Sequence, residues 1–215
     1  MSESVAPEFA RFVAAQRPPG PAPTPTAEGQ IGKVVSVRTE EAQRLLGVAA
    51  RRAAGFYRPT KRTEVVWVDG DSELAVSLTR VNLEVGKGSV SIGLIVRCDQ
   101  TGEAEVRVDF ACGAPDRPAG LYAAALRRPR GPEVIVAAWG DALVAFAWQC
   151  LLGLVSGLAN ATGKDHRGNL MVPVEMVATP QGLQIVPMAR HRFAGSSGLK
   201  PAAGTGAAPV TPVRR

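Results

Sequence analysis

The chain has 215 residues, a net charge of +6, three cysteines and a hydrophobic content of 46%. Three cysteines are too few for a disulfide scaffold, and the N-terminal residues do not predict a secretory signal. We therefore expect a cytoplasmic protein that folds around a hydrophobic core and keeps its cysteines reduced within it.

The first thirty residues are expected to form a disordered, proline-rich tail. Residues 16–26 read QRPPGPAPTPT and offer too little apolar surface to offset chain entropy. Within this tail, residues 7–14 can form two helical turns that bring Phe9, Phe12 and Val13 to one side. An apolar patch at the end of a stiff proline spacer predicts a docking motif for a protein partner. The alternative is a chance pair of aromatics.

Residues 31–193 are expected to form one α+β domain, which begins with a strand and an amphipathic helix. The strand is predicted over Ile31–Val37, and the helix over Thr39–Phe56 with Thr39 as its cap. The helix has an inward stripe at helical spacing, made of Ala42, Leu45, Leu46, Ala49, Ala53 and Phe56.

A basic cluster follows along the end of this helix and the next loop, without an intervening acid. Its members are Arg51, Arg52, Arg58, Lys61 and Arg62, with Phe56 and Tyr57 among them. This pattern predicts a site for a nucleotide, a nucleic acid or another polyanion, or contact with an anionic lipid surface. The alternative is that Arg51 and Arg52 complement the negative end of the helix while the others are solvated. A second, smaller cluster contains Arg127, Arg128 and Arg130.

The spacing of Arg58 and Arg62 is found in cyclic-dinucleotide-binding PilZ domains, where it also precedes a β-meander. The second element of that family, an Asp or Asn followed by x-Ser-x-x-Gly, is missing. The most similar segment, Asn82–Gly86, differs from this motif at both the serine and the glycine. No family membership is therefore predicted.

A four-stranded antiparallel meander is predicted over Thr63–Cys112. Two of its segments, Ser89–Cys98 and Glu103–Cys112, alternate strictly between apolar and polar residues, which is typical of a sheet covered on one face. The apolar phase slips between Leu78 and Val81, which predicts a bulge near Thr79 and Arg80.

The alternation also predicts how the strands of the meander pair. Val85 is expected opposite Val90, and Asp99 opposite Glu103. The second pairing would make a hairpin loop of Gln100, Thr101 and Gly102. In this register Cys112 lies a strand's length from Cys98, too far for a disulfide.

Three less regular elements are expected after the meander. A short helix is predicted over Ala119–Arg127 and a strand over Glu133–Ala138. A final hairpin is predicted from Leu170–Ala178 and Leu183–Ala189, as edge or irregular strands because both contain proline. The C-terminal residues 194–215 are expected to form a disordered tail of Gly, Ala and Pro.

The segment Ala142–Ala159 contains eighteen residues without a charge and is predicted to be a helix with apolar groups on every side. Asp141 is placed to cap it, and residues 160–163 supply a polar stop. Four of its residues form a ridge of mostly small side chains that lets another element approach: Ala145, Gln149, Gly153 and Gly157. At about 27 Å the helix is either a core element under the meander or a membrane-inserted segment. The polar residues at both ends of the segment favour a core helix over a membrane-inserted one.

No catalytic, cofactor-binding or metal-binding residues are predicted. Gly157–Lys164 fails the spacing of a phosphate loop, and His166 and His191 lack a Cys or carboxylate partner at useful spacing. We therefore expect a non-enzymatic interaction or assembly protein without a cofactor. A membrane-associated protein and a nucleotide or polyanion binder are the alternatives, and self-association is left open.

Overall fold

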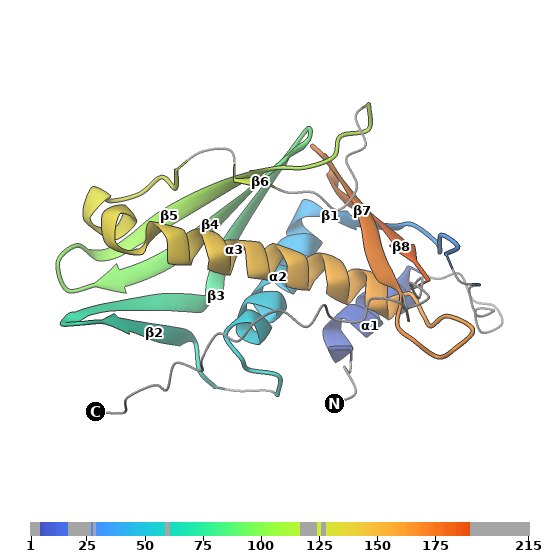
Figure 1. Cartoon of the computed structure of the whole chain (residues 1–215), viewed down its shortest axis with the longest axis horizontal. Helices are drawn as coiled ribbons and strands as arrows, with labels where there is room; N and C mark the ends of the chain where they lie inside the picture. The colour runs from blue at the N-terminus through green and yellow to red at the C-terminus, as the bar shows by residue number, and fades with distance from the viewer. Residues whose placement is uncertain are drawn as a thin grey trace, which may run out of the picture.

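The protein is described by a computed structural model that covers residues 5–16, 27, 29–58, 61–116, 124–125 and 128–189. The predicted C-terminal tail, His191 and most of the proline-rich stretch lie outside these residues. The elements in chain order are α1 (Pro7–Ala15), β1 (Val35–Arg38), α2 (Thr39–Ala53), β2 (Glu64–Asp69), β3 (Ser72–Gly86), β4 (Ser89–Cys98), β5 (Gly102–Ala111), β6 (Ala124–Ala125), α3 (Glu133–Ala161), β7 (Val172–Thr179) and β8 (Gly182–Met188). The predicted α+β architecture is confirmed, with α3 running along both sheets (Figure 1).

The five-stranded sheet has the order β2-β3-β4-β5-β6, and its first four strands are the predicted meander. Val85 pairs with Val90 as expected, and the register shifts between Val76 and Val81, where the bulge was predicted. The inward residues of β4 and β5 are buried, because alternation commits one face of each strand to the core.

The predicted register of the β4–β5 hairpin is wrong by two residues. Cys98 lies opposite Gly102 and Arg97 opposite Glu103, so the loop contains residues 99–101. Gly102 has a φ of +67°, and it is the first paired residue of β5 rather than the last loop residue. A shift of two preserves the side-chain alternation, so the apolar faces still coincide. Val90 consequently lies opposite Phe110, not Cys112.

The second sheet has three strands in the order β1-β8-β7. The predicted final hairpin is confirmed, but β8 is the middle strand and not an edge. Proline is tolerated there because β1 pairs only with residues 182–185, and Pro187 lies beyond them. The first strand is shorter than predicted, since β1 begins at Val35 and Ile31 makes only an isolated bridge.

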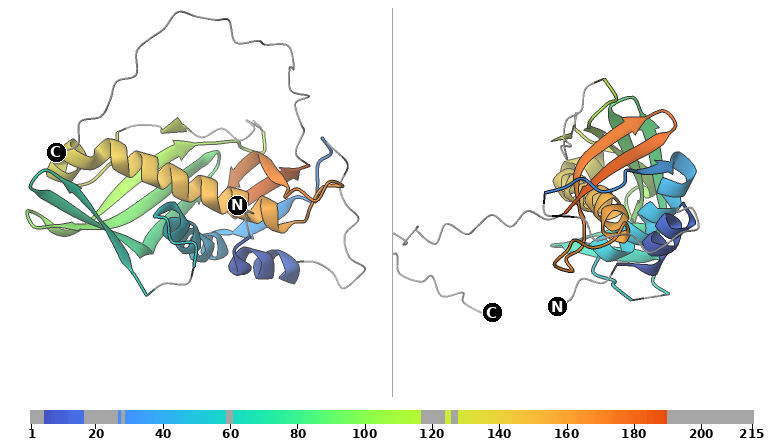
Figure 2. Two further views of the ribbon diagram at one scale, coloured as in Figure 1. Left: turned by 60° about the horizontal axis from the view of Figure 1, so that its bottom comes forward. Right: turned by 90° about the vertical axis from the view of Figure 1, so that its right-hand side faces the viewer.

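The two sheets meet at their inner ends. The Gly88 amide donates to the Ala178 carbonyl at 3.1 Å, and the Ala178 amide donates to the Gly113 carbonyl at 2.8 Å. Strand β7 therefore continues the hydrogen bonding of the large sheet beside the β3–β4 turn (Figure 2). The two sheets share one hydrophobic core.

Helix α2 begins at Thr39, but its N-cap is Arg38 and not Thr39 as predicted, and it ends at Ala53, before the predicted Phe56. The Glu41 side chain accepts the Arg38 amide at 3.4 Å and supplies negative charge to the first turn. Most of the predicted inward stripe is buried, whereas Ala53 is exposed at the frayed last turn.

Helix α3 spans 29 residues and is much longer than predicted. The strand expected over Glu133–Ala138 is wrong, and Asp141 lies within the helix rather than at its cap. The Pro132 carbonyl opens the helix by accepting the Ile135 and Val136 amides, both at 3.0 Å. Ile135 and Val136 are buried, so packing against the core overrides their preference for strands.

The short helix predicted over Ala119–Arg127 is wrong where the structure describes it. Ala124 and Ala125 form β6 and pair with Ala111 and Phe110 of β5. The neighbouring residues lie outside the described part of the chain. Strand β6 is thus the edge strand of the sheet beside β5, and very short strands are common at sheet edges.

Helix α3 is the centre of the core, as the sequence predicted. One side of it packs against α2 and both sheets, and Leu151, Leu154 and Leu158 have no exposed surface. Trp67 of β2 lies 5.6 Å from Phe146 of α3 between ring centroids, in an edge-to-face arrangement. The predicted packing of the meander on the apolar helix is thus confirmed.

Helix α1 is part of the domain, so the expected disordered tail is wrong for residues 7–15. Phe9 is only 1% exposed, and Val13 is also buried. The Phe9 ring lies against Gly157 of α3, so close that an added Cβ there would be 2.8 Å from two of its carbons. Burial of these side chains against α3 offsets the entropy of ordering the segment.

Candidate functional site

The predicted docking motif is already occupied by the chain's own core. Phe9 and Val13 are buried and Phe12 is half-buried against the same hydrophobic cluster. An external partner would reach Phe9 and Val13 only after α1 leaves its place on α3. Of the three side chains, only Phe12 is partly exposed in this structure.

The basic cluster lies where α2 leads into β2. Two of its guanidinium groups stack on the interleaved aromatics: Arg52 on Tyr57 and Arg62 on Phe56, each 5.6 Å from the ring centroid. Arg51 and Arg52 are in the last turn of α2, where positive charge complements the helix dipole. The stacks hold two cations in place but occupy one face of each ring.

The second basic cluster is paired internally in its described part. Arg128 forms a 3.1 Å ion pair with Glu133, and Arg130 forms a 3.0 Å ion pair with Asp109. Arg127 lies outside the described residues. These acids lower the positive charge at this end of the molecule, so the cluster is a poor polyanion site.

The open face of the large sheet carries a ladder of polar side chains across β3, β4 and β5. Arg107 pairs with Glu84 and Glu105, and Asn82 donates to Glu105 at 3.0 Å. The Asn82 amide and the Arg107 guanidinium hold the pKa of the Glu105 carboxyl below its usual value. Gly93 leaves the space that the Glu105 side chain fills. These charged and polar side chains bond to one another, and they do not form a catalytic pair.

The remaining chemical groups do not form a reactive centre. His166 is exposed beside Asp165, but the Asp165 carboxylate accepts the Arg167 and Asn169 amides at 2.8 Å and holds its own loop closed. Burial raises the pKa of Cys112 to about 11 and that of Cys150 to about 12, so neither is a nucleophile at neutral pH. Among the described residues, no three His, Cys, Asp or Glu side chains converge as metal ligands would.

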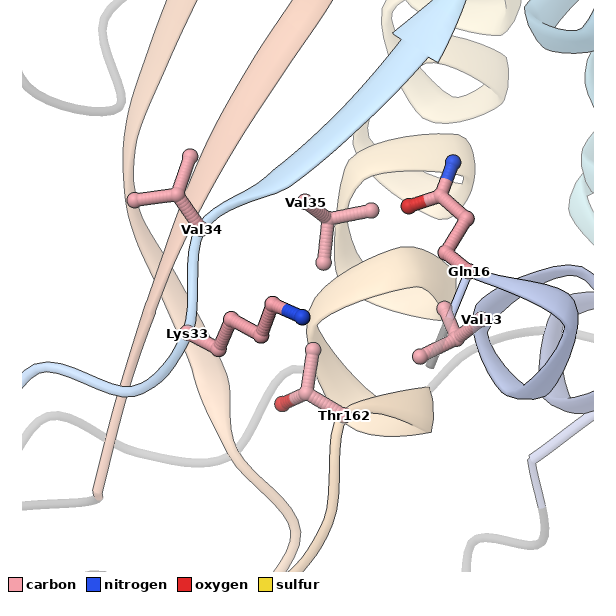
Figure 3. Close-up of a pocket in the computed structure, with 6 residues that line it drawn as sticks. All are labelled: Val13, Gln16, Lys33, Val34, Val35 and Thr162. Carbon is pink, nitrogen blue, oxygen red and sulfur yellow. The ribbon is translucent and has the colours of Figure 1, made fainter. Parts of the chain in front are cut away.

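A small hollow lies between α1, the segment before β1 and the end of α3 (Figure 3). Its volume is about 40 Å³, and its lining is Val13, Gln16, Lys33, Val34, Val35 and Thr162. This volume holds one or two water molecules and no substrate of ordinary size. Gln16 spans the hollow's edge and donates to the Ser36 carbonyl at 2.6 Å, which ties α1 to β1.

The least expected feature is the side of α3 that faces away from the core. We define the outer face of α3 by residues at helical spacing that are exposed or half-buried: Val134, Ala138, Ala142, Ala145, Gln149, Leu152 and Ser156. Val134 is 51% exposed, and Asp141 is the charged residue at the margin of this face. No described helix or strand covers it.

The ridge of small residues predicted on α3 divides between this face and the core. A Cβ added to Gly153 would lie 3.4 Å from Ala49 of α2, and Gly157 receives Phe9 of α1. Ala145 and Gln149, in contrast, are exposed. The sequence missed the outer face because an uncharged helix was expected to be buried on all sides; the small size of the side chains was the available signal.

Helix α3 is also the one described helix that is long and apolar enough to cross a membrane, and half of its most apolar stretch is buried inside the domain. Comparisons with protein-family models, curated proteins and solved structures find no match to the chain.

Proposed function

We propose that the protein is a non-enzymatic assembly module that binds a protein partner through the outer face of α3. The observation that carries this proposal is an exposed helix face without a charge over most of its length. Solvent-facing positions of a long helix ordinarily carry charged residues, and an uncharged exposed patch is typical of an interaction surface.

A protein partner accounts for this face better than a lipid bilayer does. Most large apolar residues of α3 are buried in the domain, whereas the outer face carries three alanines beside Val134 and Leu152, and alanine gains little from burial in acyl chains. Asp141 lies at its margin, and no Lys or Arg falls between Glu133 and Ala161 to hold anionic headgroups. Small side chains instead allow the close approach of another helix or strand.

A photo-crosslinking side chain introduced at Ala145, in the full chain expressed in cells, tests the proposal. The control places the same group at Gln181, which is exposed in the β7–β8 turn away from α3. We expect a protein adduct at position 145 and not at position 181. A lipid adduct at 145, or no adduct, would contradict the proposal.

A second candidate is polyanion binding at the basic cluster, which the two arginine–aromatic stacks favour because they hold cations in place before a ligand arrives. The variant Arg58→Ser with Lys61→Ser removes two exposed cations outside those stacks. We expect weaker retention on heparin near physiological salt than for the unaltered chain. If both proteins lose retention near physiological salt, the binding is only non-specific electrostatic attraction, and specific polyanion binding is contradicted.

A further inference from the structure

We infer that the partner on the outer face of α3 is a second copy of this chain, packed helix against helix in antiparallel orientation. This inference rests on the proposed function and names the partner of the same surface. Symmetric pairing of one patch with itself is the commonest arrangement of soluble oligomers.

The shape of the face suits a second α3. Ala138, Ala142 and Ala145 project little, so two such helices can approach to an axial distance of about 8 Å. Gln149 lies near the middle of α3 and is exposed. Its amide both donates and accepts hydrogen bonds, so two Gln149 side chains related by a two-fold axis can bond each other.

The charges at the two ends of α3 determine the orientation. The helix begins with the exposed Glu133 and includes Asp141, while exposed Lys164 and Arg167 follow its C-terminus. Glu133 also pairs with Arg128 of its own chain. An antiparallel partner brings the acidic end of one helix to the basic end of the other, and it opposes the two helix dipoles. A parallel partner would bring like charges together.

The area of the face sets the strength of the pairing. The outer face runs from Val134 to Ser156, about 34 Å of helix, and a face about 10 Å wide buries roughly 350 Å² per copy. Stable complexes bury about 800 Å² per partner. We therefore expect a reversible, concentration-dependent dimer that assembles in the micromolar range, from subunits that each have a complete core.

The test is sedimentation of the purified full chain between about 1 and 200 µM, with a charge swap at the two-fold axis. We expect dimers in the unaltered chain and self-association at least about tenfold weaker in Gln149→Glu and in Gln149→Lys, because each places like charges together. An equimolar mixture of the two variants should restore the dimer. The matched control Gln181→Glu should dimerise like the unaltered chain.

Disulfide trapping tests the orientation. Mixed Ala142→Cys and Ser156→Cys chains should cross-link across an antiparallel pair, above the background that Cys98 and Cys112 give in the unaltered chain. Cross-linking of Ala142→Cys only with itself would overturn the antiparallel arrangement.

The outcomes separate this inference from the proposed function. A chain that stays monomeric at about 200 µM while position 145 captures a different protein would overturn the second copy and leave the assembly role intact. A monomeric chain with no protein adduct at position 145 would overturn both. Dimers unaffected by either change at Gln149 would place the contact elsewhere and refute the inference.

Discussion

The two sides of α3 are alike in charge and opposite in environment. On the inner side, where α3 packs against α2 and both sheets, Leu151, Leu154 and Leu158 have no exposed surface. On the outer side, Ala142 and Ala145 are exposed. One helix therefore forms the core of the domain along one side and an exposed, uncharged surface along the other.

The difference teaches that an uncharged helix can have two unlike sides: leucines predominate at the centre of the inner side, and Ala138, Ala142 and Ala145 are exposed on the outer side. Large residues on the inner side fill the space between α2 and the sheets, where close packing leaves few voids. Alanine and glutamine on the outer side would gain little from such a space. They cost little in water, so this side of the helix can remain exposed.

The largest expected effect comes from the inner side. Leu154→Ala should lower the free energy of unfolding by about 2–5 kcal/mol, because it removes a fully buried side chain and leaves a cavity among rigid neighbours. Urea unfolding followed by circular dichroism measures the change. The control Ala142→Ser, on the outer side, should stay within about 0.5 kcal/mol of the unaltered chain. Equal effects at both positions would abolish the distinction between the two sides.

A smaller effect is expected at the margin, where α1 covers part of α3. Gly157→Val places new carbon atoms where the Phe9 ring lies and should displace α1 from the core. We expect a loss of about 1–3 kcal/mol and faster hydrogen exchange over residues 7–15. Ser156→Val, the next residue on the outer face, should leave the exchange of α1 unchanged. Protection of α1 in the Gly157→Val chain would show that Phe9 does not anchor it.

Much of the fold was predictable because alternation reports burial directly. The four strands of the meander, the bulge and the pairing of Val85 with Val90 all follow from where apolar residues recur. Alternation does not report register to better than two residues, since a shift of two keeps every side chain on its face. The β4–β5 hairpin shows this limit: Gly102 was expected in the loop and is instead paired with Cys98.

The elements that were predicted wrongly depend on distant contacts. Residues 133–138 are rich in Val and Ile, and only the core on which Ile135 and Val136 lie makes them helical. Phe9 was expected to be exposed in a tail, because nothing near it in the sequence shows the cleft beside Gly157. Local preference is weak beside such burial, and neither contact has a signature in the sequence.

The candidate site was visible in the sequence only as part of a larger feature. The uncharged segment Ala142–Ala159 was recognised, as was the small ridge of Ala145 and Gln149. Which part of that ridge is exposed depends on where α2 and α1 pack, and Gly153 and Gly157 turned out to be covered. The two basic clusters were identified by residue type, but their arginine–aromatic stacks and ion pairs depend on how the chain folds.

Just beyond the C-terminus of α3, Asp165 is a buried carboxylate, and it can be compared with an exposed one. It accepts the Asn169 side-chain amide at 2.9 Å besides the backbone amides of Arg167 and Asn169, and these bonds lower its pKa. Its contribution to stability is therefore complete above the unfolded-state pKa of about 3.9, and it is lost as pH falls below that value through the lower folded-state pKa. We expect Asp165→Asn to be less stable than the unaltered chain at pH 7.

Unfolding in urea at pH 7 and at about pH 3 measures this dependence, and the gap between the two proteins should narrow at the lower pH. The exposed control Asp71→Asn should differ from the unaltered chain by less than about 0.5 kcal/mol at pH 7. A gap that widens on acidification would show that the Asp165 carboxylate is not stabilised as an anion.

The last prediction concerns the rates at which the three cysteines are labelled in the unaltered chain. These rates report whether water reaches the inner side of α3. Cys98 lies near the β4–β5 loop, and a 3.2 Å hydrogen bond with the Thr101 hydroxyl lowers its pKa. Burial raises the pKa of Cys112 to about 11 and that of Cys150, on the inner side, to about 12. Since the thiolate is the reactive form, a maleimide should modify Cys98 first, Cys112 next and Cys150 last. Mass spectrometry of peptides from timed samples measures this order, and in urea the three rates should become similar. Labelling of Cys150 as fast as Cys98 in the folded chain would mean that α3 is solvated on both sides, and the contrast between its two faces would be wrong.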